Sequence, residues 1–363
     1  MRATEIVRRR LVAHRLTGEP FASAVDAVRW LGAVQSQDYA AAKWGLSLRS
    51  RTATEAEVER LFNQGAILRT HVPRPTWHFM LPEDAGWLIS LLGPRVRRGL
   101  TGRFRQLGID ETVIRGAEKA FESALQPGNP LTRQELATFL AARGISPEGQ
   151  RLPHLLAAAE LDRLLISGPR RGRQFTYGLF DERVVQPRRL DRAEALVELA
   201  RRYLRSRGPA SVQDFAWWSG LAASDARRGI LDTGMEREEI DGQELWFDAT
   251  SARGDAIPGG AHLLPNFDEY TVAYRDRSAL DPDGAVDASL FSFGSVLSNV
   301  VTLDGIVRGS WRRTLERLRV TVDIRPVDRF RRGERAAVGG AAERLGRFLG
   351  LPVRLAWPER PGR

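Results

Sequence analysis

Apolar and polar positions in the first 81 residues follow a helical period and then a strand-like one. Two segments, "TEIVRRRLVAHRL" and "SAVDAVRWLGAV", place apolar residues three or four positions apart, which predicts two helices. Thr54 and Glu57 form a capping box that opens a third helix, and Gly65 ends it. Two β-like runs, "AILRTHV" and "TWHFML", follow. Three helices followed by a two-stranded hairpin are typical of a winged helix.

A short motif, Ser/Thr-x-Gln-acid-apolar-Ala, occurs twice further along the chain. It reads "TRQELA" from Thr132 and "SVQDFA" from Ser211, and Thr132 forms a capping box with Glu135. Each copy is accompanied by amphipathic segments and by short β-like runs, and Asp241-Gly242 is a hairpin turn signal. This internal repeat predicts a second and a third winged helix.

Beyond residue 260 the pattern becomes mainly strand-like. Runs such as "AHLLPNFDEYTVAYRDR" and "RLRVTVDIRPV" predict strands, and Asp304-Gly305 predicts a hairpin turn. The sequence therefore predicts a helix-rich α+β protein with three tandem winged-helix motifs and a C-terminal β-rich, barrel-like domain. The expected domains are a winged helix with a following helix at 1–109, winged helices at 110–188 and 189–260, and the β-rich domain at 261–363.

The positive charge of the chain comes almost entirely from arginine. Of its 363 residues, 55 are Lys or Arg, and only Lys43 and Lys119 are lysines, so 53 are arginines. The formal net charge is +10. A GC-rich genome would produce the same arginine bias, but guanidinium groups also suit phosphate contacts. A net positive charge of this size favours a polyanionic partner, above all nucleic acid.

Several other classes of protein are excluded by composition and motif content. The chain has no cysteine, which excludes disulfides, thiolate zinc sites and a cysteine nucleophile. It has neither a run of roughly 18 apolar residues nor an N-terminal signal peptide. Nucleotide-binding and zinc-protease motifs are also missing. We therefore expect a cytoplasmic bacterial protein, associated with the nucleoid in use, without a cofactor, a metal or a membrane partner.

The segment "GAVQSQDYAAAKWGL" contains two glutamines, Gln35 and Gln37, at the end of an apolar helical run. On a continuing helix, side chains two residues apart point about 200° away from each other, whereas in an extended segment they share a side. The two glutamines can therefore act on one target only if the chain leaves the helix near Val34. By residue type alone, two polar residues at a helix end are the simpler interpretation.

Three segments resemble the signature segments of the AlkZ/YcaQ-like winged-helix DNA glycosylases: "VQSQDYAAAKWGLSLR", "ILRTHVPRPTWHFMLPED" and "LLPNFDEYTVAYRDR". The resemblance extends over nearly the whole chain and keeps the same order. It implies winged helices cupped around DNA and a Gln-x-Gln pair, here Gln35 and Gln37, that holds the catalytic water. Ser36 departs from the aliphatic residue that is usual between the two glutamines. The family includes an azinomycin self-resistance enzyme and relatives that unhook interstrand crosslinks.

The chemistry of glutamine narrows the substrate that this resemblance implies. An amide can orient a water molecule but cannot act as a strong base, so the base to be removed must be a good leaving group. Purines alkylated at N7 or N3 carry a positive charge and leave readily. We therefore expect a monomeric, monofunctional DNA glycosylase for cationic N7- or N3-alkylpurines in double-stranded DNA. Bulky antibiotic adducts and interstrand crosslinks are further expected substrates, in base excision repair or self-resistance. A winged-helix regulator without catalysis is the alternative, and a scaffold that binds no DNA is disfavoured by the charge.

The same segments supply further candidate residues. The resemblance places the predicted hairpin beside the glutamine pair, where His71 and Arg74 could contact phosphates and Trp77 could shape the pocket; a purely structural hairpin is the other interpretation. Asp38 is expected to cap the next turn. Asp268 is expected to be structural, although it is the main rival catalytic acid. Two histidines without a third ligand make a poor metal site. The residues predicted to bind DNA or line the lesion pocket are Lys43, Trp44, Thr70, His71, Arg74, Trp77 and His78.

Overall fold

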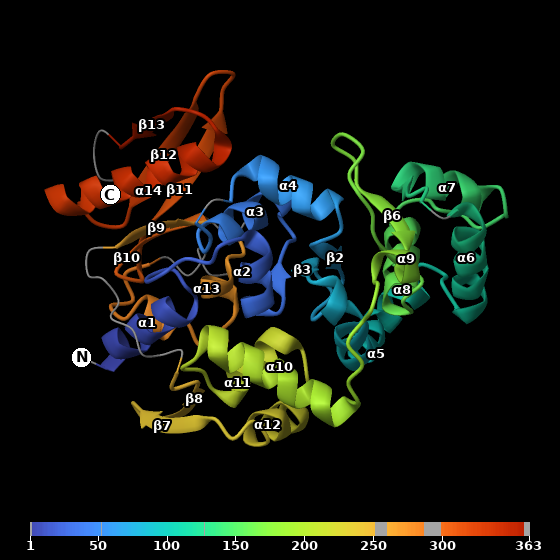
Figure 1. The fold of residues 1–363 in the computed structure, drawn as a ribbon, viewed down its shortest axis with the longest axis horizontal. Coiled ribbons are helices and arrows are strands. Elements are labelled where there is room, and N and C mark those ends of the chain that lie inside the picture. Colours follow the sequence, from blue (N-terminus) through green and yellow to red (C-terminus); the bar gives the residue numbers. More distant parts are fainter. Residues whose placement is uncertain (1, 52, 127, 251–259, 287–298, 359–363) are drawn as a thin grey trace. The chain divides into compact units, whose positions relative to one another are not determined.

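The protein is described from a computed structural model, which divides into two compact units (Figure 1). The first unit comprises residues 1–58, 197–218 and 223–363, and the second comprises residues 59–196 and 219–222. The residues that the structure describes are 2–51, 53–126, 128–250, 260–286 and 299–358.

Helices and a five-stranded sheet make up most of the first unit, and three helices carry the chain between the two units. These three are α4 (Glu55–Asn63), α10 (Arg192–Arg207) and α11 (Val212–Ser219). The helices of the first unit are α1 (Arg2–Ala13), α2 (Ala24–Leu31), α3 (Tyr39–Ser47), α12 (Ala223–Leu231), α13 (Glu269–Val272), the 3-10 helix η1 (Ser278–Leu280) and α14 (Arg332–Leu349). Its strands are β1 (Val34–Gln35), β7 (Glu236–Ile240), β8 (Gln243–Phe247), β9 (Ala261–Leu264), β10 (Asn299–Leu303), β11 (Ile306–Leu315), β12 (Val320–Pro326) and β13 (Val353–Ala356).

The strands of this sheet lie in the order β13-β12-β11-β10-β9. Neighbouring strands are antiparallel except β12 and β13, which are parallel. The hairpin turn predicted at Asp304-Gly305 joins β10 to β11, and the turn predicted at Asp241-Gly242 joins β7 to β8. All four turn residues have positive φ, as this type of tight turn requires. Helix α14 packs on the sheet, where Val338, Ala342 and Leu345 join the buried core (Figure 1).

The second unit is mainly helical and has its own hydrophobic core. Thr132 and Glu135 form the predicted capping box at the start of α7, and Gly144 adopts a positive φ just after that helix. Strand β2 pairs antiparallel with β3, and β4, β6 and β5 form a small sheet in that order. The elements of this unit are β2 (Leu68–Thr70), β3 (His78–Met80), α5 (Pro82–Gln106), α6 (Glu111–Ala124), β4 (Leu131–Thr132), α7 (Arg133–Ala141), α8 (Arg151–Leu161), β5 (Leu165–Ser167), β6 (Thr176–Leu179) and α9 (Phe180–Arg183).

The predicted α+β class is confirmed, but one expected strand is wrong. The run from 261 to 277 is a strand only as far as Leu264. Pro265 then removes a backbone donor, and Asp268 accepts a hydrogen bond from the backbone of Tyr270 and caps α13. The count of three winged helices, the four domain boundaries and the barrel-like form of the C-terminal domain stay predictions.

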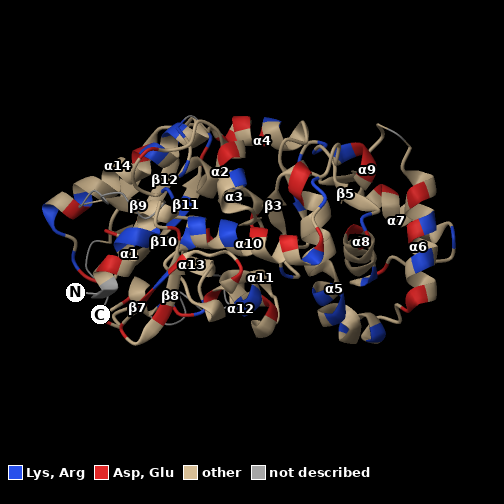
Figure 2. Cartoon of the chain, turned by 60° about the horizontal axis from the view of Figure 1, so that its bottom comes forward, with Lys and Arg blue, Asp and Glu red and all other residues tan. Residues whose placement is uncertain are grey.

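Charged positions are distributed over both units. Figure 2 shows basic and acidic residues interleaved on many helices and strands, so no single element carries the positive charge. No helix within the described ranges has both the length and the apolar character to cross a bilayer.

Candidate active site

The glutamine segment lies where the chain leaves α2. The helix ends at Leu31, and Gly32 follows with a φ of 76°, a conformation that glycine adopts without strain. The next residues are extended, and Gln35 lies in β1. The chain has thus left the helix before Val34. This is the condition under which Gln35 and Gln37 can act on one target. Gln35 is 2% exposed, whereas Gln37 is exposed.

Two neighbouring residues complete this segment. Ser36 is fully buried between the two glutamines. Asp38 is the N-cap of α3, and its carboxylate accepts a hydrogen bond of 3.0 Å from the backbone of Ala41. This bond satisfies one of the free amides at the start of the helix. The Asp38 carboxylate is therefore engaged with the helix that follows the glutamines.

Arg207, from α10, holds the end of α2 in place. Its Nη1 donates to the carbonyl of Leu31 at 2.8 Å, and its Nη2 donates to the carbonyl of Ala33 at 2.9 Å. The carbonyls at a helix C-terminus lack partners within the helix, so a guanidinium is well suited to this position. Arg207 therefore fixes the backbone immediately before Gln35.

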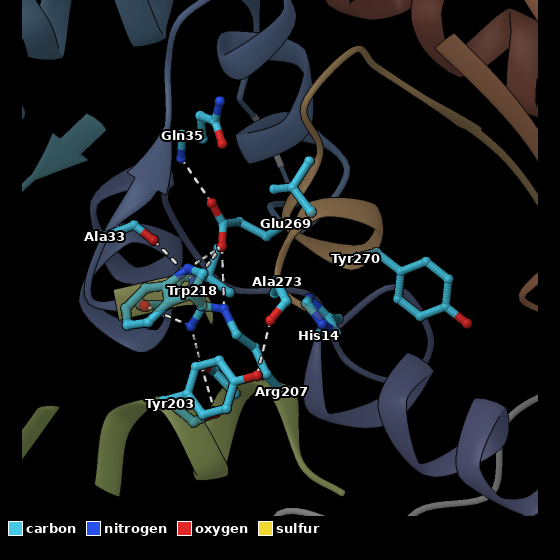
Figure 3. A network of polar contacts seen from close by, with 12 residues as sticks. His14, Ala33, Gln35, Tyr203, Arg207, Trp218, Glu269, Tyr270 and Ala273 are labelled. Carbon is cyan, nitrogen blue, oxygen red and sulfur yellow. Dashed lines mark hydrogen bonds and ion pairs between the residues drawn. The ribbon is translucent and has the colours of Figure 1, made fainter. Parts of the chain in front are cut away.

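Glu269, at the start of α13, binds the backbone of Gln35, which follows the two carbonyls bound by Arg207 (Figure 3). Its Oε1 accepts a 2.7 Å hydrogen bond from the backbone N–H of Gln35. Its Oε2 accepts hydrogen bonds from Arg207 Nη2 at 2.6 Å and from Trp218 Nε1 at 2.9 Å. The side chains of Arg207 and Glu269 are 0% and 1% exposed, so the charges compensate each other away from water. In Figure 3 the side chain of Gln35 points away from Glu269, which leaves its amide outside this network.

Several aromatic residues lie around this pair. The Arg207 guanidinium lies 4.3 Å from the centre of the Trp218 ring, and the Tyr203 hydroxyl donates to the carbonyl of Ala273 (Figure 3). His14 Nε2 is 2.9 Å from the Tyr274 hydroxyl. Burial, followed by repulsion from Arg49 and Arg207, lowers the pKa of His14 well below its ordinary value. His14 is therefore neutral near neutral pH.

Asp268 lies next to Glu269 but forms a separate ion pair. Its two carboxylate oxygens accept hydrogen bonds from Arg49 at 2.7 and 2.9 Å, and both side chains are 1% exposed. The same carboxylate caps α13. The bidentate geometry uses both oxygens of the Asp268 carboxylate within the protein. The described contacts of Asp268 are those of a structural residue, and the choice between this role and that of a catalytic acid stays a prediction.

The second unit contains the hairpin residues. His71 Nδ1 is 2.5 Å from Glu160 Oε2, and the Thr70 hydroxyl donates to the same oxygen at 3.3 Å. Glu160 is fully buried on α8. The His71 and Trp77 rings lie 3.7 Å apart, and the Arg69 guanidinium lies 4.3 Å from the centre of the Trp77 ring. These contacts orient the imidazole of His71, which is only partly buried.

The comparisons with known proteins decide the family. The model of a family described as DNA glycosylase AlkZ-like matches residues 28–348. The chain belongs to the AlkZ-like DNA glycosylase family. It is 28% identical over 357 residues to an interstrand DNA cross-link repair glycosylase of Streptomyces sahachiroi, covering 92% of this chain and 93% of that protein. The solved structure of Streptomyces sahachiroi DNA glycosylase AlkZ has the same fold, with a TM-score of 0.80 and 24% identity over 97% of this chain and 99% of that one.

The protein is therefore a DNA glycosylase, a hydrolase of N-glycosyl bonds. Two residues predicted to bind its DNA or line its lesion pocket are buried in the first unit, and their role stays a prediction. Lys43 is buried, and its ammonium lies 3.1 Å from the carboxylate of Glu55. Trp44 is in the core, where its Nε1 donates to the carbonyl of Leu263 and its ring packs on Phe348. All residues of α3 from Ala41 to Ser47 are buried, which the sequence alone did not indicate.

The hairpin of the glycosylase contains two more of the predicted residues, whose roles stay predictions. His78 is fully buried, and its Nδ1 is 2.8 Å from the carbonyl of Thr76. Arg74 is partly exposed, in the connection between β2 and β3. Because the glutamine pair belongs to the first unit and the hairpin to the second, the expected adjacency of the two groups stays a prediction. Within the described residues, no group of three or more His, Asp or Glu side chains is arranged to hold a metal.

Sequence reasoning missed three residues of the glycosylase that hold the predicted site in place. Arg207 and Trp218 are far from Gln35 in sequence, and no local pattern indicates their role. Glu160 did carry a signal, because it is a charged residue within the apolar run "LLAAAELDRLL". A charge in such a run is rarely buried without a partner.

Proposed function

We propose that this enzyme is a monofunctional glycosylase that removes cationic N7- or N3-alkylated purines from double-stranded DNA. In this proposal Gln35 and Gln37 hold the water that attacks the sugar carbon, and the positive charge of the lesion makes the base a good leaving group. An amide can align the water but cannot take its proton strongly.

One observation carries this proposal: the carboxylates of Asp38, Asp268 and Glu269 all have other partners. Glu269 is bound by Arg207 and Trp218, Asp268 by Arg49, and Asp38 by the first turn of α3. In each case the described contacts of the carboxylate serve the fold of the protein. Gln35 is thereby left as a neutral, backbone-anchored amide, which suits an enzyme restricted to bases that leave easily.

Interstrand crosslinks and bulky antibiotic adducts are the next substrates to consider. The Streptomyces sahachiroi relative is named an interstrand DNA cross-link repair glycosylase. Crosslinked N7-alkylpurines are also cationic, so the same leaving-group argument applies to them. We propose that this chain acts on such lesions, in base excision repair or in resistance of a producing organism to its own antibiotic.

The test is a comparison of lesions and variants. Duplex DNA with one N7-methylguanine, one crosslink, one uracil or one hypoxanthine is incubated with the enzyme, and abasic sites are scored. We expect release of the cationic purines alone. Gln35→Ala and Gln37→Ala should lower single-turnover excision by about 100-fold while retaining DNA affinity, because they remove the alignment of water.

Gln213→Ala is the matched control, since Gln213 is an exposed glutamine of the same unit on α11. It should excise like the wild type. Release of uracil at the rate of N7-methylguanine would contradict the leaving-group argument. Unchanged excision in both glutamine variants would remove the proposed water-holding pair.

A further inference from the structure

A hollow of about 400 Å³ lies in the first unit, outside the glutamine segment. Its walls come from the loop after α1, from the C-terminal end of α3 with the residues that follow, and from the last turns of α14. Four arginines line it: Arg15, Arg51, Arg344 and Arg347. Its remaining lining residues are uncharged, so no described carboxylate faces the hollow.

The charges of this hollow are only partly compensated. Arg51 is 2.9 Å from Glu19, and both side chains are well exposed. Arg15, Arg344 and Arg347 form no ion pair with any residue that the structure describes. In a folded protein, cations gathered at one place without counter-charges repel each other, and partial burial strengthens the repulsion.

Arg15 is held at the rim by its backbone and by aromatic rings. Its φ is 54°, a region that residues other than glycine seldom occupy. Its guanidinium lies 5.5 Å from the centre of the Phe21 ring and 5.0 Å from that of Trp30. Its Nε is buried without a hydrogen-bond partner among the described residues. The side chain is thus pre-positioned but keeps an unsatisfied donor.

Arg344 has one structural role, but that role does not explain why three other arginines line the same hollow. Its Nη2 donates to the carbonyls of Ser47 and Leu48, at 3.0 and 2.8 Å, and so completes the end of α3. Burial, followed by repulsion from Arg347 and Arg49, lowers its pKa. Helix capping explains Arg344 alone, whereas an anion in the hollow would offset the charge of all four arginines.

We propose that this hollow binds a phosphate group. Guanidinium groups present paired, planar donors that match phosphate oxygens, and the volume accommodates a phosphate together with part of a nucleotide. The phosphate could belong to a DNA strand or to a free phosphate compound. Helix α3 runs from the glutamine segment to the hollow and has nine residues, or about 13 Å. That length equals the rise of about four base pairs, within the reach of one bound strand.

The test uses undamaged duplex DNA and inorganic phosphate, so its result does not depend on excision. The key variant is Arg347→Glu, because Arg347 is exposed and its change should not disturb folding. Arg332→Glu is the matched control: Arg332 is an exposed arginine of the same helix that does not line the hollow. Arg15→Gln is a second variant at the opposite wall, and circular dichroism confirms that each protein is folded.

Binding to the duplex is measured by fluorescence anisotropy at several salt concentrations. If the hollow holds a strand phosphate, Arg347→Glu and Arg15→Gln should each lower the slope of log affinity against log salt by about 1, more than Arg332→Glu does. If it holds a free phosphate, calorimetry should show inorganic phosphate binding to the wild type and to Arg332→Glu but not to the other two variants. Either result supports the site and identifies the source of its phosphate. If neither measurement separates Arg347→Glu from Arg332→Glu, the proposal is overturned.

Discussion

Each of the two units buries a glutamate against a segment that the sequence predicts to be functional, but the two glutamates are held differently. Glu269 accepts hydrogen bonds on both oxygens, and its main partner is Arg207, which keeps its charge at any ordinary pH. Glu160 accepts contacts from Thr70 and His71 on one oxygen. Its other oxygen is buried without a hydrogen-bond partner among the described residues.

The difference lies in what each glutamate fixes. Glu269 binds the backbone N–H of Gln35, while Arg207 binds the two carbonyls that precede it, so together they determine where the peptide chain runs. Glu160 binds side chains and so determines how the His71 ring is turned. A buried ion pair is retained at a cost in desolvation, and its best-supported use is to specify one geometry. We therefore expect Glu269 to position the backbone of Gln35, and Glu160 to orient the side chain of His71, which directly follows β2.

The largest effect is expected from Glu269→Gln. This variant keeps the size of the side chain but leaves Arg207 buried without a counter-charge, which should lower the free energy of unfolding by about 3–5 kcal/mol. It should also loosen the backbone of Gln35. We expect single-turnover excision of N7-methylguanine to fall by about 100-fold at unchanged DNA affinity. Urea denaturation and excision kinetics measure the two effects, and hydrogen exchange at the Gln35 amide should become faster.

Asp268→Asn is the matched control for this prediction. It weakens the neighbouring buried ion pair with Arg49, which is equally inaccessible to water, but Asp268 makes no described contact with Gln35. We expect a comparable loss of stability with a much smaller loss of excision. Equal excision losses in the two variants would mean that Glu269 acts only through stability.

Features that depend on residues close together in the sequence could be predicted. Features that depend on contacts between distant residues could not. The capping box at Thr132 and the turn at Asp304-Gly305 depend on residues within a few positions of each other, and both are found as predicted. The chain also leaves α2 before Gln35, which a shared target for Gln35 and Gln37 requires. The partner of Glu269 is 62 residues away in Arg207, and only the folded chain brings them together. The same holds for Trp44, whose burial depends on α14 and β9.

The second largest effect is a loss of stability in acid, and it concerns the first unit. Burial, partly offset by the hydrogen bond to the carbonyl of Leu16, lowers the pKa of His262 to about 4. The unfolded chain binds a proton below about pH 6.5, while the folded state stays neutral down to about pH 4. The unfolded state thus binds more protons in this window, so stability falls as the pH drops from 6.5 to 4, by about 3 kcal/mol.

His262→Gln should remove this dependence. Glutamine can still donate to the carbonyl of Leu16 but does not titrate, so the unfolding free energy should fall less steeply between pH 6.5 and 4. Urea denaturation at several pH values measures the slope. His154→Gln, which changes a partly exposed histidine on α8, is the control and should keep the slope of the wild type. An unchanged slope in His262→Gln would show that this histidine is not buried in its neutral form.

Glu160→Gln tests the other half of the comparison. Because Glu160 forms no ion pair with an arginine among the described residues, its loss should cost about 1–3 kcal/mol, less than that of Glu269. The amide oxygen, at the position of Oε2, can still accept from Thr70 and from an N–H of His71. We expect excision to change by less than tenfold, with stability measured by the same urea method. A loss as large as that of Glu269→Gln would show that the orientation of the His71 ring matters as much as the position of the Gln35 backbone.

The smallest effect is expected at Glu118, in the second unit, and it has the opposite sign to that of His262. Burial, followed by a hydrogen bond and repulsion from Asp162, raises the pKa of Glu118 to about 7, against 4.5 in the unfolded chain. The folded state therefore binds more protons between these values, and the stabilisation present below pH 4.5 is lost as the pH rises through 7. Glu118→Gln should stabilise the protein above pH 7, by less than about 1 kcal/mol because the side chain is partly exposed. It should have no effect near pH 4.5. If hydrogen exchange in α6 slows equally at both pH values, the gain comes from packing and Glu118 is not the titrating group.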